Sequence, residues 1–297
     1  MIDIERYAGK QASVNSYLLS DANSVIVVDL LRNSIEAEEL ADHIEAGGKM
    51  LETIFVTHGH PDHYIGLGVF HRRFPKVPVK VASPEIREDI IGFSRWMESV
   101  GWLEGEPAMK VKSDKNPNGF DYAGIIQVLD KPLLKLPSEP TMIQVQSDYP
   151  GVECGHMTTL RIPEQHAFLG FDLLYNRVHA WCGPGVGKAE IHNWMQALDA
   201  IRQKTGDGDW TFYCGHGSEG RKELVGNMKE YLGAFLEVTS AVQSRQAAIG
   251  RMKTNFAPRP NSLSTRMSPP CAFTIWRAIE RPRPVPPDSR ERALSTR

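Results

Sequence analysis

The apolar positions in the first third of the chain form short runs separated by helical stretches. Residues 13–31 contain two apolar, β-branched runs around a polar turn and predict a pair of strands. Residues 51–57 predict a buried strand, and residues 77–82 predict another short one. Helical composition covers residues 34–46 and 62–74, so strands and helices alternate. This order predicts an α/β fold built in layers.

The pattern is less regular in the middle of the chain and then resumes. Residues 84–100 have the spacing of an amphipathic helix, whereas residues 101–147 are irregular and contain several prolines. Strand-like pieces are expected within this region at residues 125–129 and 142–145. The later elements are predicted as strands at 158–162, 167–174 and 210–214 and as helices at 187–204 and 219–249.

Three histidines and an aspartate fall within six residues directly after the predicted strand at 51–57. The segment reads Thr57-His58-Gly59-His60-Pro61-Asp62-His63. Imidazole and carboxylate groups are the ligands that zinc uses in catalytic sites. His58 and His60 lie two residues apart, so both can point at one ion from an extended turn. Asp62 and His63, at the start of the next helix, can point at a second ion.

This segment resembles the His-x-His-x-Asp-His signature of the metallo-β-lactamase superfamily. The rest of that family's ordered set has counterparts in this chain, which are Asp29, His156, Asp172 and His216. The resemblance covers roughly residues 10–235. It implies an α/β fold of the αββα sandwich type, in which two sheets pack face to face with helices outside.

The resemblance also implies a ligand set for two divalent metal ions. One ion would be held by His58, His60 and His156. The other would be held by Asp62, His63 and His216, with Asp172 bridging both ions and Asp29 supporting the site from behind. His166 is a rival to His156 because it also follows a strand. Zinc suits these donors, and iron or manganese is also compatible with them.

Such a site implies a metal-dependent hydrolase. A hydroxide bridging the two ions would attack the substrate, and Asp62 would orient it or pass a proton to the leaving group. The sequence Asp172-Leu-Leu-Tyr175 resembles the Asp-x-x-Tyr of the N-acyl homoserine lactonases, in which the tyrosine contacts the substrate. We therefore expect hydrolysis of an ester, a lactone or a related carbonyl substrate, with Asp62 and Tyr175 as catalytic residues. The alternative for Tyr175 is packing inside the sandwich.

Other activities on the same fold stay open at this point. A glyoxalase II-like thioesterase shares the ligand set, but its usual Gly-His-Thr-Pro-Gly-His is not found in this chain. A persulfide dioxygenase would hold one iron ion in place of two zinc ions. A β-lactamase is disfavoured because the true β-lactamases lack a bridging aspartate, where this chain has Asp172. A nuclease is disfavoured because only the C-terminal segment is basic.

The long middle region is expected to shape the substrate pocket. We interpret residues 84–150 as an insertion that caps the site and offers an apolar wall to an acyl or aromatic substrate. The alternative is an interface for dimerisation. The side chains that would form the wall are Phe93, Trp96, Met97, Trp102, Phe120, Tyr122 and Tyr149.

Composition is consistent with one large catalytic domain over residues 1–250. The 297-residue chain is 41% hydrophobic, as is usual for a globular protein. Its N-terminus does not resemble a signal peptide, and no stretch approaches the roughly 18 apolar residues of a membrane helix, so a cytoplasmic location is expected. The cysteines show no paired spacing and are interpreted as reduced thiols: Cys154, Cys182, Cys214 and Cys271. Cys154 and Cys214 each lie two residues before a histidine and are interpreted as small buried side chains, with metal ligation as the less favoured alternative.

Residues 251–297 differ from the rest of the chain in charge and in proline content. They carry ten basic and three acidic residues and eight of the 20 prolines, while the first 250 residues have a net charge of about −9. We interpret them as a basic, disordered tail, with contact to nucleic acid or phospholipid as the less favoured alternative. The expected partners are a small-molecule substrate and a second copy in a homodimer. No nucleic-acid or membrane partner is expected.

Overall fold

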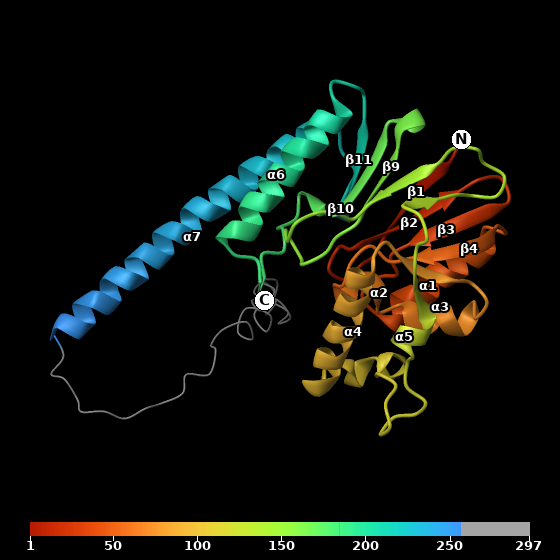
Figure 1. Cartoon of the computed structure of the whole chain (residues 1–297), viewed down its shortest axis with the longest axis horizontal. Coiled ribbons are helices and arrows are strands. Elements are labelled where there is room, and N and C mark those ends of the chain that lie inside the picture. Colours follow the sequence, from red (N-terminus) through yellow and green to blue (C-terminus); the bar gives the residue numbers. More distant parts are fainter. Residues whose placement is uncertain (184, 257–297) are drawn as a thin grey trace, which may run out of the picture. The chain divides into compact units, whose positions relative to one another are not determined.

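The computed structural model describes residues 1–183 and 185–256. Contacts within the chain divide it into a large unit, Met1–Gln246, and a second unit, Ala247–Arg297. The large unit contains two β-sheets with helices on their outer sides (Figure 1). Of the predicted basic tail, residues 251–256 continue the helix α7, and residues 257–297 lie outside the described residues.

The first sheet has six strands in the order β1-β2-β3-β4-β5-β6. The pairs β1–β2 and β2–β3 are antiparallel, and the later pairs are parallel. Parallel pairing brings the carboxyl ends of β3 and β4 to the same edge, where the histidine motif begins. The strands are β1 (Asp3–Ala8), β2 (Asn15–Ser20), β3 (Ser24–Val28), β4 (Met50–Phe55), β5 (Val79–Val81) and β6 (Ile126–Val128).

Five helices accompany the first sheet, and the two long ones begin at clear capping residues. Asn33 caps α1 and Ser83 caps α4, because each side chain accepts a backbone N–H of the first turn. The helix predicted at residues 34–46 is confirmed at both ends. The helices are α1 (Ser34–Ala46), α2 (Pro61–Tyr64), α3 (Leu67–Arg73), α4 (Pro84–Ser99) and α5 (Tyr122–Ile125).

The second sheet has five strands in the order β11-β10-β9-β8-β7. β10 and β11 are parallel and are connected through α6, and the remaining pairs are antiparallel. Trp194 and Leu198 of α6 and Leu232 of α7 pack into the apolar cluster of this sheet. The elements are β7 (Leu133–Leu134), β8 (Ile143–Gln146), β9 (Thr159–Ile162), β10 (Ala167–Asn176), α6 (Lys188–Thr205), β11 (Thr211–Gly217) and α7 (Lys222–Phe256).

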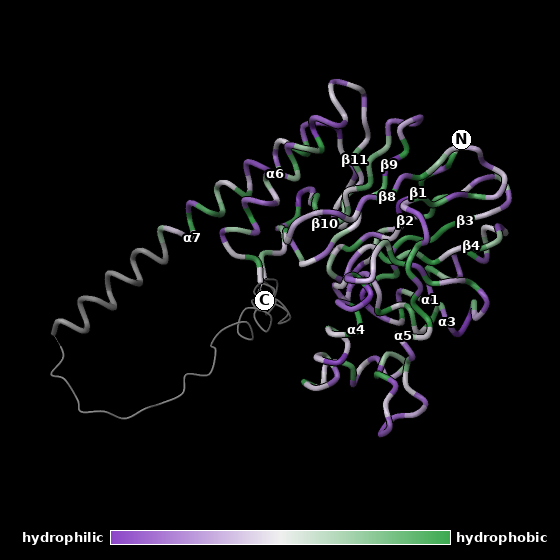
Figure 2. Tube along the Cα trace, viewed as in Figure 1, coloured by the Kyte–Doolittle hydropathy of each residue, from purple (hydrophilic) through white to green (hydrophobic). Residues whose placement is uncertain are grey.

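Side chains of both sheets meet in one apolar core. Tyr17 and Phe55 come from the first sheet, and Leu160 and Phe171 come from the second. There are two further apolar clusters. One lies between the first sheet and its helices, and the other lies between the second sheet and its helices. Figure 2 shows hydrophobic positions concentrated where the first sheet meets α1 and α3. The layered αββα arrangement predicted from the sequence is confirmed.

The region 84–150 is not one continuous insertion. It supplies β6 to the first sheet and β7 and β8 to the second. Met97, Phe120 and Tyr122, which were expected to line a cap, are buried in the core of the first sheet instead. The cap prediction is therefore corrected for these parts. For the outer face of α4 and for the 3-10 turn η1 (Trp102–Gly105) that follows it, the cap stays a prediction.

Within residues 1–183 and 185–256, no helix is long and apolar enough to cross a membrane. Cys154, Cys182 and Cys214 are free thiols, and Cys271 lies outside the described residues. The Cys154 thiol donates to the backbone carbonyl of His156, and the Cys214 thiol donates to the carbonyl of Ser218.

Candidate metal centre

The histidine motif lies in the turn between β4 and α2. His58 and His60 lie in the turn itself, and His60 is the residue that precedes the first turn of α2. Asp62 and His63 belong to that first turn. His58 and His63 are fully buried, so their imidazole nitrogens need partners inside the protein. The two ring centroids are 4.1 Å apart.

Asp29 holds this turn in place from the carboxyl end of β3. Its Oδ1 accepts the backbone N–H of Thr57 at 2.9 Å, and its Oδ2 accepts the Thr57 hydroxyl at 2.8 Å. His63 Nδ1 donates to the same Oδ2 at 2.8 Å. Because Nδ1 is engaged by Asp29, Nε2 is the nitrogen that faces the centre of the site and is available to a metal ion once it is deprotonated. The structure therefore places Asp29 behind the predicted ligands, as the sequence suggested.

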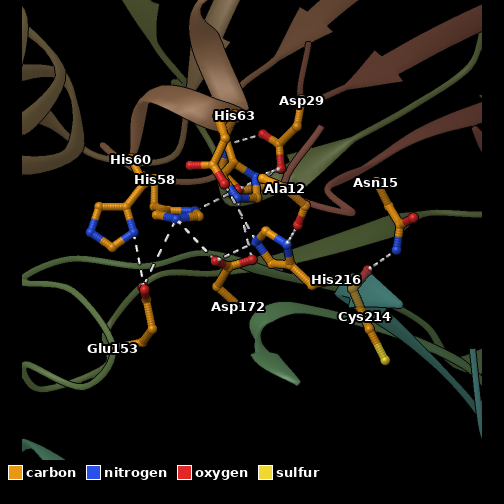
Figure 3. Close-up of polar contacts among 12 residues, drawn as sticks. Ala12, Asn15, Asp29, His58, His60, His63, Glu153, Asp172, Cys214 and His216 are labelled. Atoms are coloured by element: carbon orange, nitrogen blue, oxygen red, sulfur yellow. Dashed lines mark hydrogen bonds and ion pairs between the residues drawn. The ribbon is translucent and has the colours of Figure 1, made fainter. Parts of the chain in front are cut away.

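Asp172 lies between the two halves of the cluster (Figure 3). Its Oδ1 is 3.3 Å from His63 Nε2, and its Oδ2 is 3.2 Å from His216 Nε2. The same Oδ2 is 3.8 Å from His58 Nε2. The burial of Asp172 raises its pKa, but the neighbouring charges of His216 and His63 outweigh this effect and hold the pKa well below its usual range. Asp172 is therefore an ionised carboxylate between three imidazoles.

The backbone next to Asp172 leaves no room for a side chain. A Cβ atom at Gly215 of β11 would lie 1.7 Å from Asp172 Oδ1. Contact this close is available only to glycine. The glycine in the Cys214-Gly-His216 stretch thus has a direct role, because it lets the Asp172 carboxylate lie against β11.

His216 is oriented from the opposite side by the loop before β2. Its Nδ1 donates to the carbonyl of Ala12 at 2.8 Å, which leaves Nε2 free to face Asp172 and Asp62. Ala12 has a φ of 54°, in the left-handed region that is uncommon for a residue with a side chain. Asn15 fixes the same junction by donating to the carbonyls of Cys214 and Gly217.

Glu153 completes the first group of ligands, and the sequence did not predict it. Its Oε1 is 3.0 Å from His60 Nδ1, and its Oε2 is 3.9 Å from His58 Nε2. The side chain is fully buried. Burial raises the pKa of the Glu153 carboxyl, while the nearby His60 opposes that shift. Its position and its acidic character are those of a metal ligand rather than of a core residue.

His156, the predicted third histidine ligand, is not part of the cluster. Its Nδ1 is 2.7 Å from Asp89 Oδ2 on α4, and its side chain is 42% exposed. Glu153, three residues earlier, occupies the position expected for it, so this part of the predicted ligand set is corrected. The rival residue His166 also lies elsewhere, in a turn with a φ of 50° where its ring packs on Trp210.

Tyr175 contacts a ligand of the site through its hydroxyl. The hydroxyl donates to Asp172 Oδ2 at 2.7 Å, and its ring stacks on His216 with the centroids 4.9 Å apart and the planes 1° from parallel. The side chain is buried. Burial and the charge of Asp172 raise the Tyr175 pKa well above its usual value, so the hydroxyl keeps its proton. This geometry makes Tyr175 a positioning residue for Asp172 and His216.

The donor atoms form two groups that fit metal ions. His58, His60, Glu153 and Asp172 make one group, and Asp62, His63 and His216 make the other, with ligand atoms in each lying within 4.8 Å of one another. Several of these buried atoms have no hydrogen-bond partner within the described part of the chain. They are His58 Nε2, His63 Nε2, both oxygens of Glu153 and Asp172 Oδ1. Buried polar atoms are costly when unpaired, and a bound cation would satisfy them.

The pKa shifts of the histidines in the metal-free site run in both directions. Burial lowers the pKa of His63, but the charges of Asp172 and Asp29 outweigh this effect and raise it well above its usual value. Burial and the neighbouring His63 lower the pKa of His58 well below its usual value, so its imidazole is neutral and able to bind a metal. Burial lowers the pKa of His216, but the charge of Asp172 outweighs this effect and raises it to about 9. Glu153, Asp172 and Asp62 bring carboxylates beside these imidazoles. A mixed set of imidazole and carboxylate donors suits zinc, iron or manganese.

The fold and the site together define a class, namely a two-sheet α/β protein with a His- and carboxylate-rich metal centre at the sheet edges. A family model described as "Metallo-beta-lactamase superfamily" matches residues 9–135. No curated protein matches the chain in a sequence comparison.

Several solved structures share the fold. The DIM-1 metallo-beta-lactamase is 14% identical and has a TM-score of 0.53, with 78% of this chain and 93% of that chain covered. A metallo-beta-lactamase from Pontibacter korlensis is also 14% identical, with a TM-score of 0.53 and coverage of 78% and 99%. FIM-1 from Pseudomonas aeruginosa, in its mono-zinc form, is 12% identical, with a TM-score of 0.51 and coverage of 78% and 90%. At these identities the likeness concerns the fold alone.

The chain is therefore similar to the metallo-beta-lactamase superfamily over residues 9–135 and shares the fold of the solved metallo-beta-lactamases. It has a site able to hold metal, and the residues that would hold the metal come from the edges of both sheets.

Proposed function

We propose that this protein hydrolyses an ester or lactone with the help of two divalent metal ions, for which zinc is the first candidate. The observation that carries the proposal is the position of Asp172 between the two donor groups. Its Oδ1 is 3.3 Å from His63 and its Oδ2 is 3.2 Å from His216, both in the second group, and Oδ2 is also 3.8 Å from His58 in the first group. A carboxylate in this place can bridge two ions. His58, His60 and Glu153 would complete the first ion's ligands, and Asp62, His63 and His216 would complete the second ion's.

Divalent ions at these positions would act as Lewis acids toward the carbonyl and would lower the pKa of a bound water. The residues of the chain have separate tasks. Asp62 is the carboxylate of the second group, and 17% of its side chain is accessible, so it can orient an incoming water and accept its proton. Tyr175 supports the reaction through Asp172, which its hydroxyl contacts, and not through the substrate.

A row of aromatic rings leads away from the first donor group and favours a substrate with an apolar part. The ring centroid of Phe93 is 6.4 Å from that of His60, Trp96 is 5.2 Å from Phe93, and Trp102 is 4.9 Å from Trp96. Trp96 and Trp102 are 43% and 37% exposed. Tyr149 belongs to the second sheet's cluster and shares a hydrogen bond with Thr159. We infer that the aromatic row Phe93–Trp96–Trp102 contacts the acyl or aromatic portion of the substrate.

The first test is an activity panel on metal-loaded protein. The panel contains lactones and esters of increasing acyl length, thioesters and a β-lactam, and the matched inactive control is His58→Ala. We expect ester or lactone turnover that depends on added metal and is absent from the variant. Turnover of thioesters alone would favour the glyoxalase II-like alternative, and one iron ion with no hydrolysis would favour the persulfide dioxygenase.

The aromatic row is tested by Trp96→Ala in the same panel. Each methylene that packs on an apolar wall adds about 0.8 kcal/mol, which corresponds to about a fourfold gain in kcat/KM. We expect this gain along the acyl series to shrink in the variant. Ile35→Ala is the matched control, because Ile35 is an exposed apolar side chain on α1. The same dependence on acyl length in wild type and Trp96→Ala would remove the row from the proposal.

A further inference from the structure

We propose that His156, oriented by Asp89, donates the proton that the leaving group needs when the substrate bond breaks. The inference rests on the proposed hydrolase function, and it gives a role to the histidine that does not join the metal ligands. In the structure His156 Nδ1 is 2.7 Å from Asp89 Oδ2, and neither residue belongs to the two donor groups.

The pair lies against the first donor group. A Cβ atom on Gly59, which separates His58 from His60, would be only 2.8 Å from Asp89 Cβ. Asp89 therefore packs directly on the backbone of the histidine turn. Phe93 follows Asp89 by one turn of α4, and its ring contacts the ring of His60. Residues four apart share one face of a helix, so the Asp89 face of α4 is the face that lies over the site.

The loop that carries Glu153 brings His156 to the same place. Glu153 points into the cluster, and His156 follows it by three residues with Gly155 between them. A Cβ atom on Gly155 would lie 3.7 Å from Asp89 Oδ2, so the loop backbone also approaches the aspartate. The Cys154 thiol donates to the carbonyl of His156 at 3.1 Å and holds the loop in this shape.

The chain contains a second histidine–carboxylate pair near the site, and the comparison separates their roles. His63 and Asp29 are fully buried, and the free nitrogen of His63 faces Asp172. In the His156–Asp89 pair the two side chains are 42% and 38% exposed. A histidine whose Nδ1 is held by a carboxylate keeps Nε2 for proton transfer, which is the usual arrangement of a general acid or base. The buried pair would serve a metal ion, whereas the open pair can meet a substrate.

The proposed step balances as an ordinary ester hydrolysis. The oxygen of water forms a bond to the carbonyl carbon, and its proton passes to Asp62 and from there to solvent. The bond between the carbonyl carbon and the leaving oxygen then breaks. That oxygen takes the proton from Nε2 of the doubly protonated His156, which solvent protonates again. In a lactone the leaving oxygen stays in the product as an alcohol.

The test compares leaving groups, because only a poor leaving group needs a proton donor. Wild type, His156→Gln and Asp89→Asn are assayed on an alkyl ester or lactone and on the p-nitrophenyl ester of the same acid. General acid catalysis contributes about 100-fold or more. We expect His156→Gln to lose about 100-fold in kcat on the alkyl ester and only a few-fold on the p-nitrophenyl ester. Asp89→Asn should show the same selectivity with a smaller loss.

Metal content is measured on the same samples. His156→Gln should keep the metal content of wild type, and Glu153→Gln should lose metal. The matched control is His43→Gln, because His43 forms an exposed pair with Glu5 at 2.7 Å and should change neither readout.

Loss of metal from His156→Gln, with metal retained in Glu153→Gln, would make His156 a ligand and overturn the proposal. An equal loss of rate on both esters would also overturn it. If wild type binds metal but hydrolyses neither ester, the proposed function itself fails, and the proton-donor role fails with it.

Discussion

Replacing Asp29 with asparagine should weaken metal binding in the second donor group while the fold is kept. Asp29 accepts three hydrogen bonds, one at Oδ1 from the Thr57 N–H and two at Oδ2 from the Thr57 hydroxyl and His63 Nδ1. An asparagine side chain has one oxygen and one NH₂ group, so one side of it can no longer accept. Either orientation therefore breaks part of the arrangement.

The magnitude follows from the two orientations. If the NH₂ group faces Thr57 N–H, a buried donor is left unpaired at a cost of about 1–3 kcal/mol in folding free energy. If it faces His63, the ring must carry its proton on Nε2 and can no longer bind metal through that atom. Loss of such a supporting contact usually reduces metal affinity about 10- to 100-fold, or about 1.4–2.7 kcal/mol.

The assay is a metal titration against a competing chelator, paired with urea unfolding of the metal-free protein. Asp21→Asn is the matched control, because Asp21 is a buried aspartate that accepts the N–H groups of Asn23, Ser24 and Ser138 outside the donor groups. It should reduce stability without changing metal affinity. If Asp29→Asn bound metal as tightly as wild type, the orientation of His63 by Asp29 would have no part in building the site.

Three further predictions address the second sheet's side of the site. Tyr175→Phe removes the bond to Asp172 Oδ2 but keeps the ring stack, so a metal titration should show about a tenfold loss of affinity; unchanged affinity with a large loss of kcat would place the phenol on the substrate instead. Gly215→Ala should displace Asp172 and abolish metal binding, since its Cβ would lie 1.7 Å from Oδ1, and a variant that retains full metal content would contradict this reading. In the metal-free protein, the His216 pKa of about 9 exceeds the usual value of 6.5, so its contribution to stability is complete below pH 6.5 and is lost as pH rises through 9. Urea unfolding between pH 6 and 9.5 should show this slope in wild type and not in His216→Gln, and equal slopes would refute the assignment.

The metal-binding turn could be predicted because its geometry is local. His58, His60, Asp62 and His63 all lie between the end of β4 and the first turn of α2, so their spacing alone sets which side chains converge. Asp172 and His216 could be placed through the family resemblance, and the structure brings both to the cluster. Asp172 lies on β10 and His216 lies on β11, and the hydrophobic periodicity of a strand can be recognised in a sequence.

The third ligand could not be predicted in the same way. Glu153 and His156 lie on one irregular loop, and either could reach the site. In the structure His156 instead shares a hydrogen bond with Asp89, which is 67 residues away along the chain. A contact between distant segments leaves no periodic signal in the sequence. The only local hint was an acidic residue without an obvious basic partner nearby.

The limits of the fold prediction have a similar cause. β1 was not predicted because its sequence, Asp3-Ile-Glu-Arg-Tyr-Ala8, is that of an edge strand with several exposed positions. β6 and β8 were recognised as strand-like pieces, but their sheets were not, since strands of three and four residues carry too little pattern to show their partners. Because the sheet partners of β6 and β8 were not recognised, residues 84–150 were interpreted as one cap.

The measurement that tests the central claim most directly is elemental analysis of the purified chain beside His58→Ala and Asp172→Asn. The account predicts about two divalent metal ions per wild-type chain and a clear loss in both variants, because His58 Nε2 and Asp172 Oδ1 are buried and make no hydrogen bond with any described residue. Wild-type protein that binds no metal after loading with zinc, manganese or iron would contradict it.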